Sequence, residues 1–181
     1  MFNATIDADT FREAIDAIAA LVTECRLHAD PNGLRMRAVD TANVAMVSME
    51  LRKDAFAQYA ANAEELGMDI AKMKNILSMM GKGDMLTMQL GDTGHKLEIV
   101  FRNYKYSITL LDPNTIRKDP NPPTIELPGF AVLTGEALNS AIKAATVVSD
   151  KIALGIDPKR ETFYMVAEGD IDHIRLELGR D

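Results

Sequence analysis

The stretch GLRMRAVDTANVAMVSMEL, residues 33–51, returns in a weaker form near the end of the chain. At an offset of about 127 residues, VSMEL (47–51) aligns with IRLEL (174–178), and Asp30-Pro31 aligns with Asp157-Pro158. After a further shift of two, Met36-Arg37-Ala38 aligns with Met165-Val166-Ala167. One structural unit therefore occurs about one and a half times, because the first copy runs on for about sixty residues where the second copy stops.

Hydrophobic periodicity predicts the elements of the first copy. Apolar residues recur at helical spacing from Phe11 to Val22, behind an N-cap at Asp7 or Asp9, and again from Ile70 to Met80. Alternating runs separated by turn residues predict strands. These strands are expected at 2–6 and at about 24–30, 33–39, 43–51, 66–69, 84–90, 96–102 and 104–111.

The segment DPNTIRKDPNPPTIELP, residues 112–128, interrupts this pattern. It is rich in proline and has no helical period, which is typical of an extended, semi-rigid linker. We therefore divide the chain into a first domain at 1–112, a linker at 113–128 and a partial second domain at 129–181. In the second domain the repeat predicts a strand at 129–133, a helix at 135–148, and strands at about 151–156, 162–168 and 172–178.

The order of elements predicts an α+β fold, in which antiparallel sheets carry their helices on one side. The second copy ends before its second helix, so its sheet is expected to expose an apolar face. Either the chain is a fragment or another segment completes this domain.

Composition limits the class of protein. The net charge of −7 argues against a surface that coats nucleic acid, although a local basic strip stays compatible with it. Cys25 is the single cysteine, so an intramolecular disulfide is excluded and a reducing compartment is expected. No signal sequence or membrane-spanning run is present. We expect a cytoplasmic protein without a membrane partner.

Catalytic patterns are weak. His28, His95 and His173 lie far apart and lack metal-ligand spacing. The densest acidic run, 168–173, is more typical of a turn between strands than of a metal or acid–base site. We expect no enzyme activity, no metal and no cofactor.

Three stretches together resemble one known family: residues 33–51, YSITLLDP (106–113) and VVSDKIALG (147–155). They are similar to the DNA polymerase sliding clamps of the PCNA type, and most like the archaeal members. The resemblance implies a two-domain clamp fold with helices on the inner face, assembled as a homotrimeric ring around double-stranded DNA. It implies a processivity factor that binds DNA without sequence preference and docks DNA polymerase, the clamp loader and other peptide-motif replication and repair proteins. It also implies that the second domain continues further than it does here.

The same resemblance suggests which residues face DNA. Family helices line the ring, and the basic residues on or beside the helices here are Arg12, Lys72, Lys74, Lys82 and Lys143. Ala19 stands at a position that is often basic in the family, so the lining is weaker than usual. Solvated helix faces would carry the same residues, and spacing alone does not separate the two interpretations.

Two further surfaces follow from the resemblance. Ring closure would pair the strand at 104–111 with the strand at 172–178 of the next subunit, through Tyr104, Tyr106, Ile108, Leu110, Ile174, Leu176 and Leu178. A partner-peptide pocket would involve Asn43, Val44, Met46 and Ile116. As alternatives, both strands could be internal and Val44 and Met46 could be core residues. An acidic peptide-binding scaffold that forms no ring is the alternative function.

Overall fold

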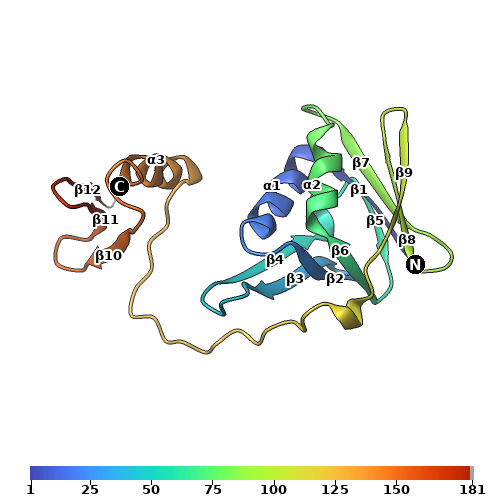
Figure 1. Ribbon diagram of the computed structural model, residues 1–181, viewed down its shortest axis with the longest axis horizontal. Helices are drawn as coiled ribbons and strands as arrows, with labels where there is room; N and C mark the ends of the chain where they lie inside the picture. The colour runs from blue at the N-terminus through green and yellow to red at the C-terminus, as the bar shows by residue number, and fades with distance from the viewer. Residues whose placement is uncertain (180–181) are drawn as a thin grey trace. The chain divides into compact units, whose positions relative to one another are not determined.

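The computed structural model describes residues 1–179, which belong to two compact units, Met1–Pro122 and Pro123–Asp181 (Figure 1). Each unit is described by itself. Both are α+β units in which antiparallel sheets carry helices, as the order of elements predicts.

The first unit contains two antiparallel sheets. One is five-stranded with the order β5-β1-β7-β8-β9, and the other is four-stranded with the order β4-β3-β2-β6. The strands are β1 Phe2–Asp7, β2 Glu24–Asp30, β3 Gly33–Val39, β4 Met46–Arg52, β5 Gln58–Ala61, β6 Glu64–Asp69, β7 Met85–Leu90, β8 Lys96–Phe101 and β9 Tyr104–Thr109. Burial alternates along most of these strands, so each sheet has one face on the core.

Helices α1 (Ala8–Ala19) and α2 (Ile70–Ser78) pack against each other and cover this core. Asp7 is the N-cap of α1, with its carboxylate accepting a hydrogen bond of 3.0 Å from the Thr10 amide. Asp69 caps α2 in the same way, through the Lys72 amide at 2.9 Å. These caps satisfy amides that the first helical turn leaves without a partner.

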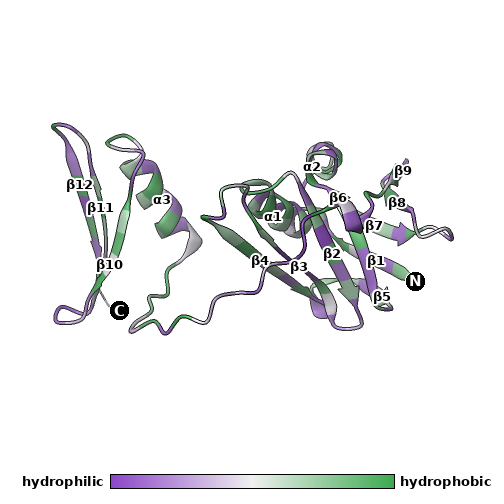
Figure 2. Ribbon diagram, turned by 60° about the horizontal axis from the view of Figure 1, so that its bottom comes forward, coloured by the Kyte–Doolittle hydropathy of each residue, from purple (hydrophilic) through white to green (hydrophobic). Residues whose placement is uncertain are grey.

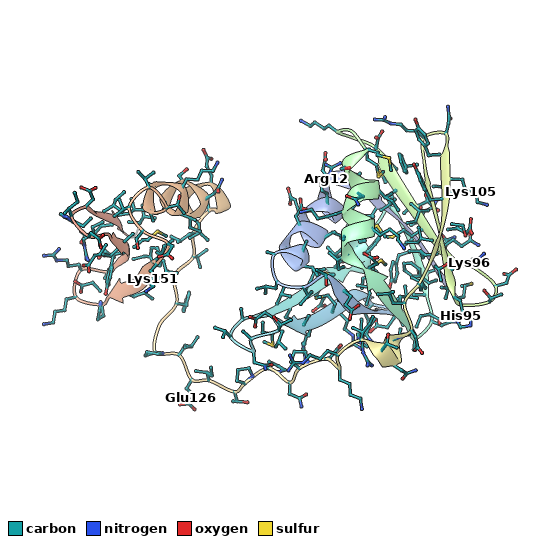
Figure 3. All side chains as sticks on the ribbon, in the orientation of Figure 1. Arg12, His95, Lys96, Lys105, Glu126 and Lys151 are labelled. Carbon is teal, nitrogen blue, oxygen red and sulfur yellow. The ribbon has the colours of Figure 1, made fainter. Side chains whose placement is uncertain are left out.

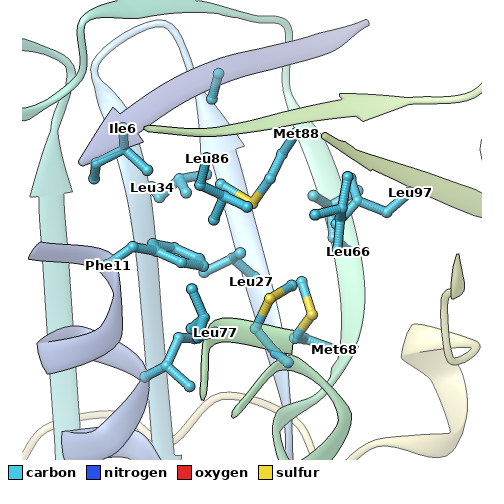
Figure 4. Packing of buried hydrophobic residues seen from close by; sticks show 14 of the residues in the cluster. Ile6, Phe11, Leu27, Leu34, Leu66, Met68, Leu77, Leu86, Met88 and Leu97 are labelled. Carbon is cyan, nitrogen blue, oxygen red and sulfur yellow. The ribbon is translucent and has the colours of Figure 1, made fainter. Parts of the chain in front are cut away.

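The core of the first unit joins both helices to both sheets. Phe11 of α1 and Leu77 of α2 lie among Leu27, Leu34 and Leu86 from the strands (Figure 4). All five side chains are fully buried or nearly so. Apolar burial of this kind is the main favourable contribution to folding, so the first unit has a substantial core of its own.

Several elements differ from the sequence-based expectation, mostly by a few residues at their ends. The strand β5 was not predicted, and β6 begins at Glu64 instead of residue 66. The strand expected at 43–51 begins only at Met46, because Asp40 accepts hydrogen bonds from the Val44 and Ala45 amides at 2.8 and 2.9 Å. These bonds hold residues 40–45 as a loop.

The second unit contains α3 (Gly135–Ala145) and the three-stranded sheet β10-β11-β12. Its strands are β10 Ala153–Asp157, β11 Thr162–Glu168 and β12 His173–Leu178. Helix α3 has hydrophobic and hydrophilic bands along it (Figure 2). The buried core consists of Ala141, Ala145, Met165 and Ala167, which is small in comparison with the first unit.

Strand registers show that the two units are true repeats. Met36 pairs with Met49 between β3 and β4, and Met165 pairs with Leu176 between β11 and β12. The shift of two in the sequence alignment arises in one turn. Asp30 pairs with Gly33 across a tight turn, whereas Asp157 pairs with Thr162 across a longer one.

The strand predicted at 129–133 is wrong, because these residues form no strand. Their counterpart in the first unit is β1, which pairs with β5 and β7. Both of these strands follow β4, and the last strand among the described residues of the second unit is β12, the counterpart of β4. Residues 129–133 therefore have no counterpart of β5 or β7 to pair with among residues 1–179.

Candidate nucleic-acid and partner interfaces

Lysines of α2 lie on its exposed face, where each is close to an acidic residue. The Lys74 ammonium lies 2.9 Å from an Asp16 carboxylate oxygen across the α1–α2 contact, and about half of each side chain is exposed. The Lys72 ammonium lies 3.9 Å from Asp69, the N-cap of its own helix. Exposed pairs of this kind contribute little to stability but cancel much of the local charge.

Arg12 has a different environment from the lysines. It pairs with Asp9, and it donates hydrogen bonds of 3.1 and 2.8 Å to the carbonyls of Leu77 and Met80. These carbonyls lie at the end of α2, so Arg12 caps that helix from α1 (Figure 3). A cation is favourable there because a helix C-terminus carries partial negative charge. Arg12 is thus engaged within the fold.

Lys82 is exposed in the turn that follows α2. That turn is held by Asp84, which accepts hydrogen bonds from the Gly81 amide at 2.7 Å and from Arg102 at 2.9 Å. The Arg102 side chain and then the Gly81 amide lower the pKa of Asp84 below its ordinary value of 3.8.

Lys143 is exposed in the last turn of α3, in the second unit. Within α1, α2 and α3 the basic and acidic residues are equal in number: Arg12, Lys72, Lys74 and Lys143 against Asp9, Glu13, Asp16 and Glu136. The helix faces are therefore close to neutral.

Strand β9 lies at the edge of the five-stranded sheet and carries a row of aromatic rings. Tyr106 stacks on Phe101 with ring centroids 5.9 Å apart, and Tyr104 stacks on Tyr106 at 6.4 Å. Tyr104 is 54% exposed, whereas Tyr106, Ile108 and Leu110 are partly buried against the core. Among the described residues β9 pairs with β8 alone, so its outer backbone edge is open.

Strand β12 is one of the two edges of the second unit's sheet, and a cavity of about 310 Å³ lies between it and α3. Small residues of α3, Ala137 and Ala144, form one side of the cavity, while Ile174, Leu176 and Leu178 of β12 form the other. Ile174 and Leu176 also pack on the core. Both predicted closure strands are thus sheet edges, and neither is internal among residues 1–179.

The four residues assigned to a peptide pocket divide into two environments. Val44 is 85% exposed, Met46 is also exposed, and Asn43 adopts a left-handed backbone with φ of 59°. The alternative that Val44 and Met46 are core residues is therefore wrong. Ile116 is only 5% exposed, and it lines a cavity of about 230 Å³ with apolar residues such as Val39 and Cys25.

Side chains of the first unit fasten the start of the linker, which the sequence did not reveal. Arg26 donates hydrogen bonds of 3.1 and 2.6 Å to the Ile116 carbonyl. Arg117 reaches back to Asn43 and to the Asp40 carbonyl at 3.4 Å, and His28 lies 2.7 Å from Asp119. The linker residues 116–119 are thereby held beside the loop that presents Val44. In the sequence, the one sign of this contact is that the basic residues Arg26 and His28 alternate with apolar residues along β2.

Groups with catalytic potential are dispersed. Within residues 1–179 no group of three or more His, Cys, Asp and Glu side chains could hold a metal ion. His95 and His173 are exposed on different units. None of the described helices is both long and apolar enough to span a membrane.

Comparison with known proteins gives a consistent result. The family model "Proliferating cell nuclear antigen, N-terminal domain" matches residues 1–113. The "DNA polymerase sliding clamp" of Methanosphaerula palustris is 68% identical over 181 residues, which are 100% of this chain and 73% of the relative. The protein of the same name from Methanoculleus marisnigri is also 68% identical, with the same coverage.

Solved structures agree with the sequence relatives. The structure described as the "C-terminal region of FEN-1 bound to A. fulgidus PCNA" matches with a TM-score of 0.89 and 32% identity, over 99% of this chain and 72% of that one. PCNA from Thermococcus kodakaraensis matches with a TM-score of 0.81 and 28% identity, over 99% of this chain and 73% of that one.

Proposed function

This chain belongs to the PCNA family of DNA polymerase sliding clamps, and from that membership we propose that it forms a homotrimeric ring around duplex DNA. The ring makes a polymerase processive by tethering it to its template. The proposal rests chiefly on two edge strands, β9 and β12, which lie in different units of a chain with the clamp fold. If β9 of each subunit pairs with β12 of the next, the contact is head-to-tail, and such contacts close a ring when the rotation between subunits allows it.

Ring closure requires complementary side chains as well as open backbone edges. Tyr104 and Tyr106 of β9 present aromatic rings, and most residues that line the cavity between α3 and β12 are apolar. We infer that the edge of β9 adds to β12 of the next subunit and that the aromatic rings cover this cavity. Strand addition satisfies the backbone groups of both edges, while the rings remove apolar surface from water.

Encirclement allows the DNA contact itself to be weak. A ring is retained on DNA by its topology, and tight phosphate contacts would only slow its movement along the duplex. We infer that α1, α2 and α3 face the DNA through Lys72, Lys74 and Lys143, with Lys82 beside them. Their near-neutral faces support a weak contact that is independent of sequence. Arg12 contributes mainly by holding α2 in position.

Docking of replication and repair enzymes is the third part of the proposal. The relative from A. fulgidus is described as bound to the C-terminal region of FEN-1. We infer that Val44 and Met46 offer exposed apolar contacts to peptides of this kind, beside the fastened linker and the cavity lined by Ile116. The clamp then acts as a scaffold for other enzymes, including the polymerase and the clamp loader, and performs no catalysis of its own.

Retention on DNA tests this function directly. The purified protein is loaded onto nicked circular DNA with a clamp loader, and its release is followed after the circle is linearised. A ring stays on the circle and runs off the linear ends, while light scattering reports a trimer. A stable monomer that leaves both templates equally fast would exclude the ring and support the acidic peptide-binding scaffold instead.

A further inference from the structure

The strongest unassigned feature is the ion pair between Asp16 of α1 and Lys74 of α2. It joins two helices that are far apart in sequence, and the ammonium–carboxylate distance is 2.9 Å. Lys72, the other lysine of α2, lies 3.9 Å from its nearest carboxylate. Lys74 is therefore the more completely neutralised of the two lysines.

This pair affects any phosphate that approaches Lys74. Both side chains are about half exposed, so a phosphate can reach the ammonium group. The Asp16 carboxylate stays within a few ångströms of that phosphate and repels it. This separation is shorter than the Debye length of about 8 Å at physiological ionic strength, so salt screens the repulsion only in part. Glu13, exposed one turn earlier on α1, adds negative charge to the same face.

We propose that Asp16 sets the strength of the DNA contact by masking Lys74. The residue is a brake on electrostatic binding and keeps the clamp mobile on the duplex. This inference rests on the proposed function, because it requires that α1 and α2 face DNA. It goes beyond that function by assigning a role to an acidic residue, where a DNA-binding surface would be expected to use basic ones.

The test compares two variants with the same change in net charge. Asp16→Asn keeps the size of the side chain and removes its charge. Asp92→Asn makes the same change in the exposed turn between β7 and β8, away from both helices. Binding to a short linear duplex is measured by fluorescence anisotropy at several salt concentrations, so that topological retention does not contribute. Thermal unfolding of both variants verifies that they are folded.

Asp16→Asn should tighten binding about fivefold at low salt, which is the scale of one exposed ion pair. The slope of log affinity against log salt should steepen by about 0.9, because one more phosphate is neutralised. Asp92→Asn should change neither quantity appreciably. Diffusion of the loaded ring along DNA should slow in Asp16→Asn alone.

A double variant separates masking from a general charge effect. Adding Lys74→Gln to Asp16→Asn should abolish the gain, because the lysine that was unmasked is gone. Equal binding by Asp16→Asn and Asp92→Asn would overturn the inference. If replacing Lys72, Lys74 and Lys143 together also left binding unchanged, the assignment of the helices to DNA would fail. If Asp16→Asn bound like Asp92→Asn but the triple replacement weakened binding, the helices would still face DNA, and only the masking role of Asp16 would be wrong.

Discussion

The two copies of the repeat share one helix and three strands, yet the same position is buried in one copy and exposed in the other. Leu27 of β2 is 2% exposed, and its counterpart Leu154 of β10 is 59% exposed. In the first unit β2 pairs with β6, and α2 covers its inner face. Neither element has a counterpart among the described residues of the second unit. The local sequence thus determines whether a strand forms. The elements that pack on the strand determine how much its apolar residues contribute to the stability of the unit.

The largest contrast between the units should appear in thiol reactivity. Cys25 is buried in β2, and burial raises the pKa of its thiol to about 12, so the reactive thiolate is scarce at neutral pH. Its counterpart in the second copy is Ile152, which is only partly buried. In a Cys25→Ser background, Ile152→Cys should react with a thiol reagent about a hundredfold faster than native Cys25.

A chromogenic disulfide reagent at neutral pH measures both rates. In denaturant, where neither site is protected, the two proteins should react at similar rates. Comparable rates under native conditions would show that the second copy protects this position as well as the first does.

Matched core truncations should separate the units by free energy of unfolding. Leu27→Ala removes a fully buried side chain and should cost about 2–5 kcal/mol. Leu154→Ala changes an exposed residue and should stay within about 0.5 kcal/mol. Denaturant unfolding followed by circular dichroism measures both values. A cost at Leu154 similar to that at Leu27 would mean that another segment covers β10 in solution.

The link between α1 and α2 gives a smaller contrast. Arg12→Met keeps most of the apolar stem but removes the hydrogen bonds to the Leu77 and Met80 carbonyls. A charged donor is lost from two carbonyls, so we expect a cost of about 1.5–3 kcal/mol. The counterpart of Arg12 on α3 is Asn139, which is exposed and faces no second helix among the described residues.

Asn139→Met is therefore the matched control and should change stability by less than about 0.5 kcal/mol. Hydrogen exchange of the last turn of α2 gives a local measurement, and it should accelerate in Arg12→Met alone. Unchanged exchange in that turn would argue against the capping role.

Much of the fold is predictable because it depends on short-range patterns. The N-cap at Asp7, the two helices and the hairpin strands follow from periodicity and turn residues within a few positions. The strand expected at 129–133 does not form for a long-range reason, since β5 and β7, the partners of β1, have no counterpart among the described residues of the second unit. The sequence does not determine whether Met46 faces the core or the solvent, because Val44, Met46 and Val47 are all apolar and so do not alternate with polar residues.

The candidate site was less predictable than the fold. Basic residues can be listed from the sequence, but their partners cannot, because Asp16 and Lys74 meet only after α1 packs on α2. The same holds for Arg12, because the Leu77 and Met80 carbonyls that it binds follow it by more than sixty positions. The family resemblance indicates which surfaces are functional. The packing of the helices determines which charged side chains on those surfaces have no partner of opposite charge.

The smallest expected effect concerns the turn between α2 and β7, which the described part of the second unit lacks. Arg102 and the Gly81 amide lower the pKa of Asp84, so its charged form stabilises the folded state. A lowered carboxyl pKa contributes stability above the ordinary value of 3.8 and loses it as the pH falls through the folded value.

Asp84→Asn should therefore be less stable than the parent at pH 7, and the difference should shrink as the pH falls below about 3.8. Asp170→Asn, in an exposed turn of the second unit, has no hydrogen bond or ion pair to lose among residues 1–179 and should match the parent throughout. Urea unfolding at a series of pH values provides the comparison. A constant difference between Asp84→Asn and the parent across this range would mean that the Asp84 charge is not what holds the turn, and that its hydrogen bonds serve equally well when the side chain is neutral.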